Sequence, residues 1–166
     1  MTFAIDDAFL PATLSARPVT DEEFSAFCAD HPDLNFEMSS DGELIVIAPA
    51  HSDTGASSFE VAGELRNWAR KDRCGYGCDS STGFVLPNGA RRSPDASWTL
   101  KSRVRQPGLG GRKAFWHLCP DFVIEIKSDS DRFRTLRSKM VEYLQQGAQL
   151  DGFVLDLTYV WDPLAD

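Results

Sequence analysis

Apolar residues recur along this chain at two spacings, one typical of amphipathic helices and the other of strands. The longest helical pattern runs from about Asp53 to Lys71, where apolar residues three or four positions apart form a stripe and charged residues occupy the other faces. The stripe consists of Phe59, Ala62, Leu65, Trp68 and Ala69. This pattern predicts a long surface helix with one buried face.

Two more helices are predicted, one on either side of this long helix. Thr20 and Glu23 have the spacing of a capping box, so a short helix should begin there and end before Pro32. A further helix is expected over about 132–146, with Asp131 as its N-cap. The apolar side of that helix is predicted to consist of Phe133, Leu136, Met140, Tyr143 and Leu144.

Segments with strand character alternate with these helices. Asp41-Gly42 and Asn88-Gly89 are turn signals that should join four of the strands into two hairpins, whereas Gly75 and Gly77 indicate a break after the long helix. The predicted strands are 34–38, 43–48, 82–86, 95–100, 121–127, 150–157 and 158–161. Mixed strands and helices in this order favour an α/β fold in which a mixed β-sheet is flanked by helices.

Length and composition favour one folded domain. A chain of 166 residues with 42% hydrophobic residues can bury a core, and we expect a single domain over 1–166 with an extended lead-in over 1–18. No apolar run approaches a membrane span, and Asp6 and Asp7 replace the basic start of a signal peptide, so we expect a cytoplasmic protein. The cysteines lack zinc-site spacing and are expected to be free thiols; they are Cys28, Cys74, Cys78 and Cys119.

The strand predicted over 121–127 carries the most distinctive chemistry. Its residues alternate between an apolar face and a largely charged face, which places Glu125 and Lys127 on the same side of the sheet, roughly 6–7 Å apart. A carboxylate can hold a divalent metal and an ammonium group can orient a water or stabilise negative charge, so the pair suits phosphodiester hydrolysis. Asp95, which follows Pro94 at the start of another predicted strand, is the candidate second carboxylate.

The order and spacing of these residues resemble the PD-(D/E)XK nuclease superfamily and, more narrowly, the Uma-type restriction endonucleases. The matching residues are Glu37, the segment 41–49, His51, Pro94, Asp95, the segments 120–125 and 128–131, Lys139, Tyr143 and Gly147. The resemblance implies a restriction-endonuclease-like fold, Mg²⁺ or Mn²⁺ as cofactor, and Asp95, Glu125 and the backbone carbonyl of Ile126 as metal ligands. It also implies that Glu37 joins the acidic cluster, although Glu43 on the partner strand is equally acidic.

Several of these residues also have ordinary structural explanations. Asp95 fits a turn, Glu125 fits a solvent-facing strand position, and Lys127 fits a surface partner of Glu125. Many proteins that resemble this chain have an apolar residue at the position of Lys127, so Lys139 on the following helix is a reserve catalytic lysine. His51 has the position of a helix cap, and the resemblance makes it an accessory candidate.

The charge of the chain is unevenly distributed. The net charge is −8, but residues 91–139 contain 12 basic and 5 acidic residues, a local charge of +7. This segment favours a phosphate-binding surface, with a solvated basic loop as the alternative. The candidate nucleic-acid-binding residues are Arg103, Arg105, Arg112, Lys113, Arg132 and Arg134.

These patterns predict an endonuclease, dependent on Mg²⁺ or Mn²⁺, that hydrolyses phosphodiester bonds of DNA in preference to RNA. A homodimer would allow two single sites to cut both strands of a duplex. One alternative is a nuclease-like module without turnover that binds nucleic acid or protein. Another is a hydrolase of small phosphoesters.

Overall fold

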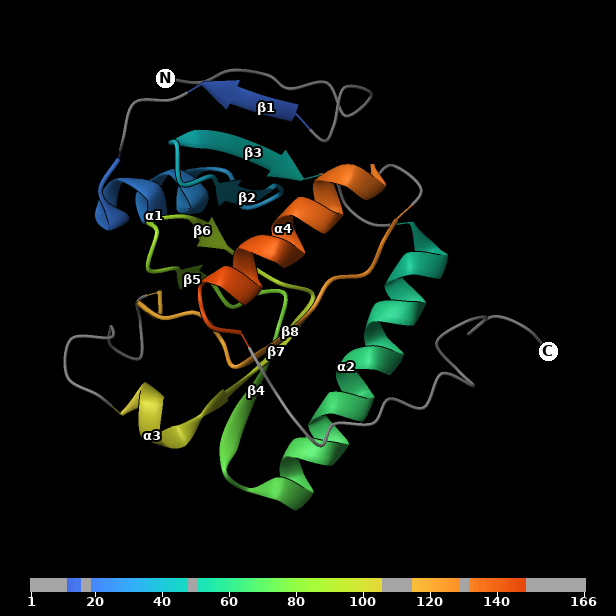
Figure 1. Ribbon diagram of the computed structural model, residues 1–166. Helices are drawn as coiled ribbons and strands as arrows, with labels where there is room; N and C mark the ends of the chain where they lie inside the picture. Colours follow the sequence, from blue (N-terminus) through green and yellow to red (C-terminus); the bar gives the residue numbers. More distant parts are fainter. Residues whose placement is uncertain (1–11, 16–18, 48–50, 106–114, 129–131, 149–166) are drawn as a thin grey trace.

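The computed structural model describes residues 12–15, 19–47, 51–105, 115–128 and 132–148 (Figure 1). Two antiparallel sheets and the helices packed on them form an α/β fold, as predicted. The elements are β1 (Ala12–Ser15), α1 (Asp21–Asp30), β2 (Asn35–Met38), β3 (Glu43–Ile47), α2 (Ser52–Asp72), β4 (Gly75–Asp79), β5 (Phe84–Val85), β6 (Arg91–Arg92), β7 (Ala96–Leu100), α3 (Lys101–Val104), β8 (Phe122–Ile124) and α4 (Phe133–Gln145).

The first sheet has the strand order β1-β3-β2-β6-β5, and its neighbouring strands pair antiparallel. The predicted hairpin of β2 and β3 is confirmed, with Glu37 opposite Ile45. Residues 12–15, predicted as part of an extended lead-in, form β1 and pair with β3. Ala12 to Ser15 alternate between apolar and polar residues, but a run of only four residues is too short to indicate a strand clearly.

The second sheet has the order β4-β7-β8. The long helix ends at Asp72, just before Gly75, as predicted, but no strand was predicted there: Gly75 and Gly77 both lie in β4, where Gly75 pairs with Leu100. A Cβ atom at Gly75 would collide with the indole ring of Trp98. Glycine therefore stands here because another side chain approaches the backbone closely, a role that weakens the sequence signal for a strand.

In the second predicted hairpin, the strand after the turn is not the one expected. The turn after Leu86 is tight, since Gly89 has a φ of +87° and its N–H donates to the Leu86 carbonyl oxygen at 2.8 Å. As a result β5 pairs with β6, only a few residues later, and not with 95–100. The chain then passes through Pro94 into β7 of the second sheet. Asp95 therefore lies in the segment that connects β6 of the first sheet to β7 of the second.

All three predicted helices are present as α1, α2 and α4. The capping box of α1 forms as predicted, since the Thr20 hydroxyl accepts from the Glu23 N–H and the Glu23 carboxylate accepts from the Thr20 N–H. The N-cap residue of α4 is Arg132, which makes no side-chain capping bond; Asp131 lies outside the described residues. The predicted strands 150–157 and 158–161 also lie outside them.

The apolar stripes of α2 and α4 were predicted only in part. In α2, Leu65 is buried but Phe59 is 77% exposed. In α4, Tyr143 is fully buried, whereas Phe133 is 70% and Leu144 is 64% exposed. The face that α4 turns inward is thus the one that carries a tyrosine hydroxyl and, one turn before it, a lysine.

Strand β8 is covered on both sides. On one side Val123 packs with Tyr143 of α4, and on the other Phe122 and Ile124 pack in the cluster that contains Leu65 of α2. Part of the strand face predicted to be charged is therefore covered by α4, with Val123 buried and the Glu125 side chain 7% exposed, whereas Lys127 further along is exposed. Glu125, at the end of this strand, is placed under the helix.

The cysteines are free thiols, as predicted. Cys74 is exposed, whereas Cys119 is buried, and burial raises the pKa of the Cys119 thiol to about 11. Because the thiolate is the reactive form, we expect iodoacetamide at pH 8 to label Cys74 rapidly and Cys119 only on unfolding. Mass spectrometry of peptides from native and urea-treated protein checks this. Equal labelling rates in native protein would contradict the packing around Cys119.

Within the described ranges, no helix is long and apolar enough to cross a membrane.

Candidate active site

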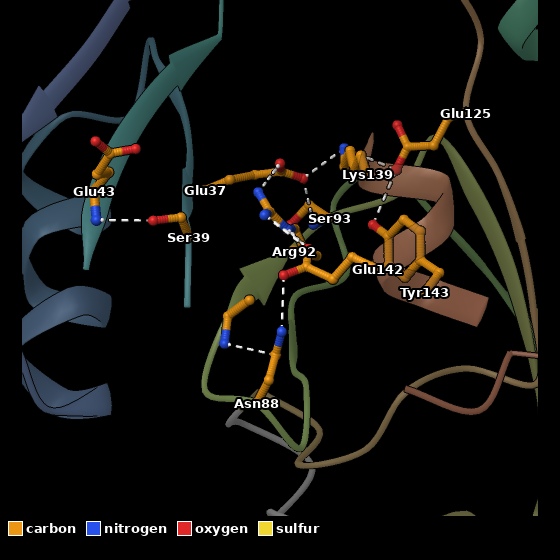
Figure 2. A network of polar contacts seen from close by, with 11 residues as sticks. Glu37, Ser39, Glu43, Asn88, Arg92, Ser93, Glu125, Lys139, Glu142 and Tyr143 are labelled. Carbon is orange, nitrogen blue, oxygen red and sulfur yellow. Dashed lines mark hydrogen bonds and ion pairs between the residues drawn. The ribbon is translucent and has the colours of Figure 1, made fainter. Parts of the chain in front are cut away.

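Glu37 in β2 is the acidic centre of a buried polar network (Figure 2). Its side chain is 3% exposed, and its two oxygen atoms accept three hydrogen bonds. The guanidinium of Arg92 donates to Oε2 at 3.1 Å, while the N–H of Ser93 and the ammonium of Lys139 donate to Oε1, both at 2.9 Å. A carboxylate fixed by a backbone N–H and two cations keeps one orientation.

Glu125 lies directly after β8 and faces α4. The ammonium of Lys139 lies 2.7 Å from its Oε1 atom, and the hydroxyl of Tyr143 donates to the same oxygen at 2.9 Å. Residues four positions apart on a helix share a face, which explains how Lys139 and Tyr143 reach one carboxylate together. The side chain of Glu125 is 7% exposed, so its contacts form largely away from water.

Lys139 therefore joins two carboxylates that come from different sheets. Figure 2 shows its side chain between Glu37 and Glu125, with the ammonium within 3 Å of both. Burial alone would lower the pKa of Lys139, but the two carboxylates outweigh that effect and hold the pKa above its usual value. The raised pKa favours the charged ammonium form of Lys139, which lies between the two carboxylates.

Asp95 links the first residues of β7 to the end of β8. Its Oδ2 atom accepts from the N–H of Ile126 at 2.6 Å. The negative charge of Asp95 also helps to raise the pKa of Glu125, which places the two carboxylates within electrostatic reach of each other. The predicted pair Asp95 and Glu125 is thus brought together by neighbouring strands.

The cluster contains more negative charge than its own cations offset. Burial raises the pKa of Glu125 to about 7, Glu37 and Asp95 raise it as well, and Lys139 opposes the shift without cancelling it. Burial is the largest of these causes, and the Lys139 ammonium offsets only part of the cost of ionising Glu125 away from water. A divalent cation bound at Glu125 would offset more of it.

Arg92 and Glu142 form the outer part of the network. The Nε atom of Arg92 donates to Oε2 of Glu142 at 2.8 Å, and Nη2 lies 2.7 Å from the same oxygen. Its Nη1 atom donates to Glu37. The side-chain amide of Asn88 donates to the other Glu142 oxygen at 2.8 Å. This chain of contacts connects the turn between β5 and β6, through α4, to Glu37 in β2 (Figure 2).

The carboxylates of the cluster have the chemistry that a divalent cation requires, but their oxygen atoms do not converge on one point. No three histidine, cysteine, aspartate or glutamate side chains in the described part of the chain converge closely enough to hold a metal ion. The reason is visible in the geometry, since the Lys139 ammonium stands between Glu37 and Glu125. The available donors are carboxylate oxygens, which Mg²⁺ and Mn²⁺ prefer.

The remaining candidates lie outside this cluster or contact it only indirectly. Lys127 is exposed, and its ammonium donates to the backbone carbonyl of Ser128 at 2.9 Å. His51 is exposed at the start of α2 and makes no side-chain capping bond. Ile126 contributes the N–H that binds Asp95.

The predicted nucleic-acid-binding residues are divided between paired and exposed positions. Arg103 forms an ion pair with Asp121 at 2.6 Å, and the same carboxylate accepts from the N–H of Leu100. Arg103 therefore already has an internal carboxylate partner. Arg105, Arg132 and Arg134 are exposed. Arg112 and Lys113 lie outside the described residues.

Sequence reasoning missed Arg92 and Glu142. Arg92 was read only as part of the basic segment, and Glu142 only as a helix residue. A signal for Glu142 exists, because it lies three residues after Lys139 and next to Tyr143, on the side of α4 that faces β6. No comparable signal exists for Arg92, whose partner Glu37 is 55 residues away.

The two sheets and the covering helix α4 form an α/β fold that encloses a buried glutamate–lysine cluster. The sequence pattern of the Uma2 family, described as "Putative restriction endonuclease", matches residues 21–156. The chain belongs to this family.

A solved structure has a similar fold. It is described as a "putative nuclease belonging to DUF820" from Anabaena variabilis ATCC 29413, with 19% sequence identity and a TM-score of 0.61. The match covers 80% of this chain and 71% of that one. No curated protein gives a significant match.

Proposed function

We propose that this protein is an endonuclease that uses Mg²⁺ or Mn²⁺ to hydrolyse phosphodiester bonds of DNA. The observation that carries the proposal is the Lys139 ammonium placed 2.7 and 2.9 Å from the carboxylates of Glu125 and Glu37, with Asp95 on the adjoining strand. Membership of a restriction endonuclease family supports a nucleic-acid substrate, and DNA in particular.

Each residue of the cluster has a distinct part in this proposal. Asp95, Glu125 and the carbonyl of Ile126 would hold the cation, with Glu37 as a further carboxylate; the cation would supply Lewis-acid stabilisation of the charge on the phosphate. Lys139 would orient the attacking water and stabilise the developing negative charge, because it is the lysine placed among the carboxylates.

Tyr143 and Arg92 act as positioning residues. Tyr143 fixes one oxygen of Glu125, and Arg92 fixes one oxygen of Glu37, so both carboxylates are oriented before substrate arrives. Lys127, exposed and bonded to the Ser128 carbonyl, is the second choice for the catalytic lysine. A single site in each chain cuts one strand, so double-strand cleavage would require two copies of the chain, as in a homodimer.

The first test is cleavage of supercoiled plasmid and of single-stranded DNA with Mg²⁺ or Mn²⁺. We expect wild-type protein to cut, and Asp95→Ala and Glu125→Ala to reduce the rate by about 100-fold or more, because each removes a proposed ligand. Glu43→Ala is the matched control, since Glu43 is an exposed carboxylate in the same hairpin as Glu37. It should cut at the wild-type rate.

Two results would contradict the proposal in different ways. Equal cutting by wild type and both ligand variants would place the activity outside this site. Binding of DNA without any metal-stimulated cutting would favour the alternative, a nuclease-like module without turnover. Cleavage of a nucleotide phosphoester with long DNA left intact would favour the small-phosphoester hydrolase.

A further inference from the structure

A groove runs along the outer side of α4, next to the buried cluster. One wall is a face of α4, and the other is formed by the turns of the two hairpins in the first sheet. The lining residues are Arg134, Arg137, Ser138, Val141, Glu142 and Gln145 from α4, with Ser40 and Asn88 from the turns. The groove has a volume of about 390 Å³ and is open to solvent.

The two arginines of this groove differ from the other arginines near the site. Arg91, Arg92 and Arg103 are each paired with carboxylates. Arg134 and Arg137 are exposed, and within the described residues neither has a carboxylate partner. Guanidinium groups without an internal partner are available for an anion from outside the chain.

The spacing of these arginines suits a polyanion. Residues three apart on a helix lie on one side and about 4.5 Å apart along its axis, and both arginines line the same groove. Glu142, the one carboxylate in the lining, is neutralised by Arg92, which contacts it at 2.7 and 2.8 Å. The groove therefore presents net positive charge.

The groove also adjoins the catalytic cluster. Ser138 of its lining precedes Lys139, and Glu142 is bonded to Arg92, which holds Glu37 (Figure 2). One helix thus carries both the site lysine and the two groove arginines.

We propose that this groove binds the sugar-phosphate backbone of a polynucleotide strand, with Arg134 and Arg137 as phosphate ligands. The inference rests on the proposed function, since it takes nucleic acid as the substrate. Arg137 was not among the residues expected from sequence to bind nucleic acid. Arginine forks match phosphate geometry, and the apolar side chain of Val141 offers a surface for the sugars.

The test compares two double variants that remove the same charge. The variant Arg134→Ala/Arg137→Ala removes the two arginine side chains of the groove. The variant Arg66→Ala/Arg70→Ala removes two exposed arginines of α2. Binding of fluorescein-labelled duplex and single-stranded 20-mers is measured by anisotropy in EDTA, at several salt concentrations. Circular dichroism melting verifies that both variants are folded.

For the groove variant we expect Kd to rise at least about tenfold and the slope of log K against log salt to fall by about 1.5 to 2, as two phosphate contacts are lost. The α2 variant should bind as wild type does. Equal weakening in both variants, unchanged binding in the groove variant, or no binding by wild type would each overturn the inference.

The outcome separates this inference from the proposed function. If wild type cuts DNA and the groove variant binds and cuts like the α2 control, the nuclease stands and the groove assignment falls. If the groove variant loses binding but wild type never cuts with Mg²⁺ or Mn²⁺, the groove stands and the nuclease falls.

Discussion

Replacing Lys139 with methionine is expected to abolish DNA cleavage and, in the same protein, to strengthen the binding of Mg²⁺ or Mn²⁺. The first effect follows from the proposed role of the ammonium in orienting water and stabilising negative charge. Groups with that role contribute factors of about 10² to 10⁴ to the rate. A decrease of that size in the cleavage rate is expected at saturating metal.

The second effect follows from the position of the ammonium. Lys139 lies within 3 Å of Glu37 and Glu125, where it offsets part of their charge and competes with an added cation. Methionine has a similar length and no charge, so the variant leaves two buried carboxylates that repel each other. Since unit charges about 4 Å apart interact by several kcal/mol near a protein surface, we expect metal affinity to rise at least about tenfold.

Isothermal titration calorimetry with Mn²⁺ and with Mg²⁺ measures the affinity independently of activity. Thermal unfolding with and without metal gives a second readout: the variant should be less stable than wild type without metal and should gain more stability when metal is added. Lys127→Met is the matched control, because Lys127 is exposed and donates to the Ser128 carbonyl. It should leave cleavage and affinity nearly unchanged.

The opposite result would be equally informative. If Lys127→Met abolished cleavage and Lys139→Met retained it, Lys139 would be a structural counter-ion and Lys127 the catalytic lysine. If Lys139→Met bound metal more weakly than wild type, the ammonium would stabilise the metal-binding arrangement and would not compete with the cation.

The sequence indicates those parts of the proposed site that depend on local spacing. Asp95 directly precedes one predictable strand and Glu125 directly follows another, and the helical position of Lys139 follows from the spacing of α4. These three residues could be proposed before the fold was known. Their number and chemistry also indicated the kind of reaction.

What could not be predicted depends on contacts between distant segments. Which lysine contacts Glu37 and Glu125 depends on how α4 packs on β8, and that packing turns Tyr143 inward while leaving Phe133 exposed. Likewise, the role of Arg92 depends on the tight turn that pairs β5 with β6 and so places Arg92 beside Glu37. A single sequence contains no signal for a pairing across 55 residues.

Arg92→Met is expected to cause the largest loss of stability among single substitutions in this network. Arg92 is 9% exposed and compensates Glu37 and Glu142, which are 3% and 16% exposed. Removing a buried cation leaves the charges of its partners without compensation, which costs about 3–5 kcal/mol in comparable buried ion pairs. The free energy of unfolding in urea, with an unchanged m-value, measures this loss.

Arg91→Met is the matched control in the adjacent position. Arg91 also has a carboxylate partner, but Asp21 is 28% exposed, so water can compensate its charge after the substitution. Arg91 also donates to the Val19 carbonyl and lies over the Phe24 ring, so a measurable but clearly smaller loss is expected. Equal losses at the two positions would show that burial of the carboxylates does not determine the effect.

A double variant separates uncompensated charge from lost packing. If the cost of Arg92→Met comes mainly from the carboxylates left behind, then Arg92→Met/Glu142→Met should recover part of the lost stability, because one of the two uncompensated charges is removed as well. If packing is the cause, the double variant should be less stable than either single variant. In the double variant, Glu37 keeps its contacts with Lys139 and the Ser93 N–H but loses Arg92. Recovery would therefore indicate that Arg92 stabilises the folded protein mainly by compensating buried carboxylates.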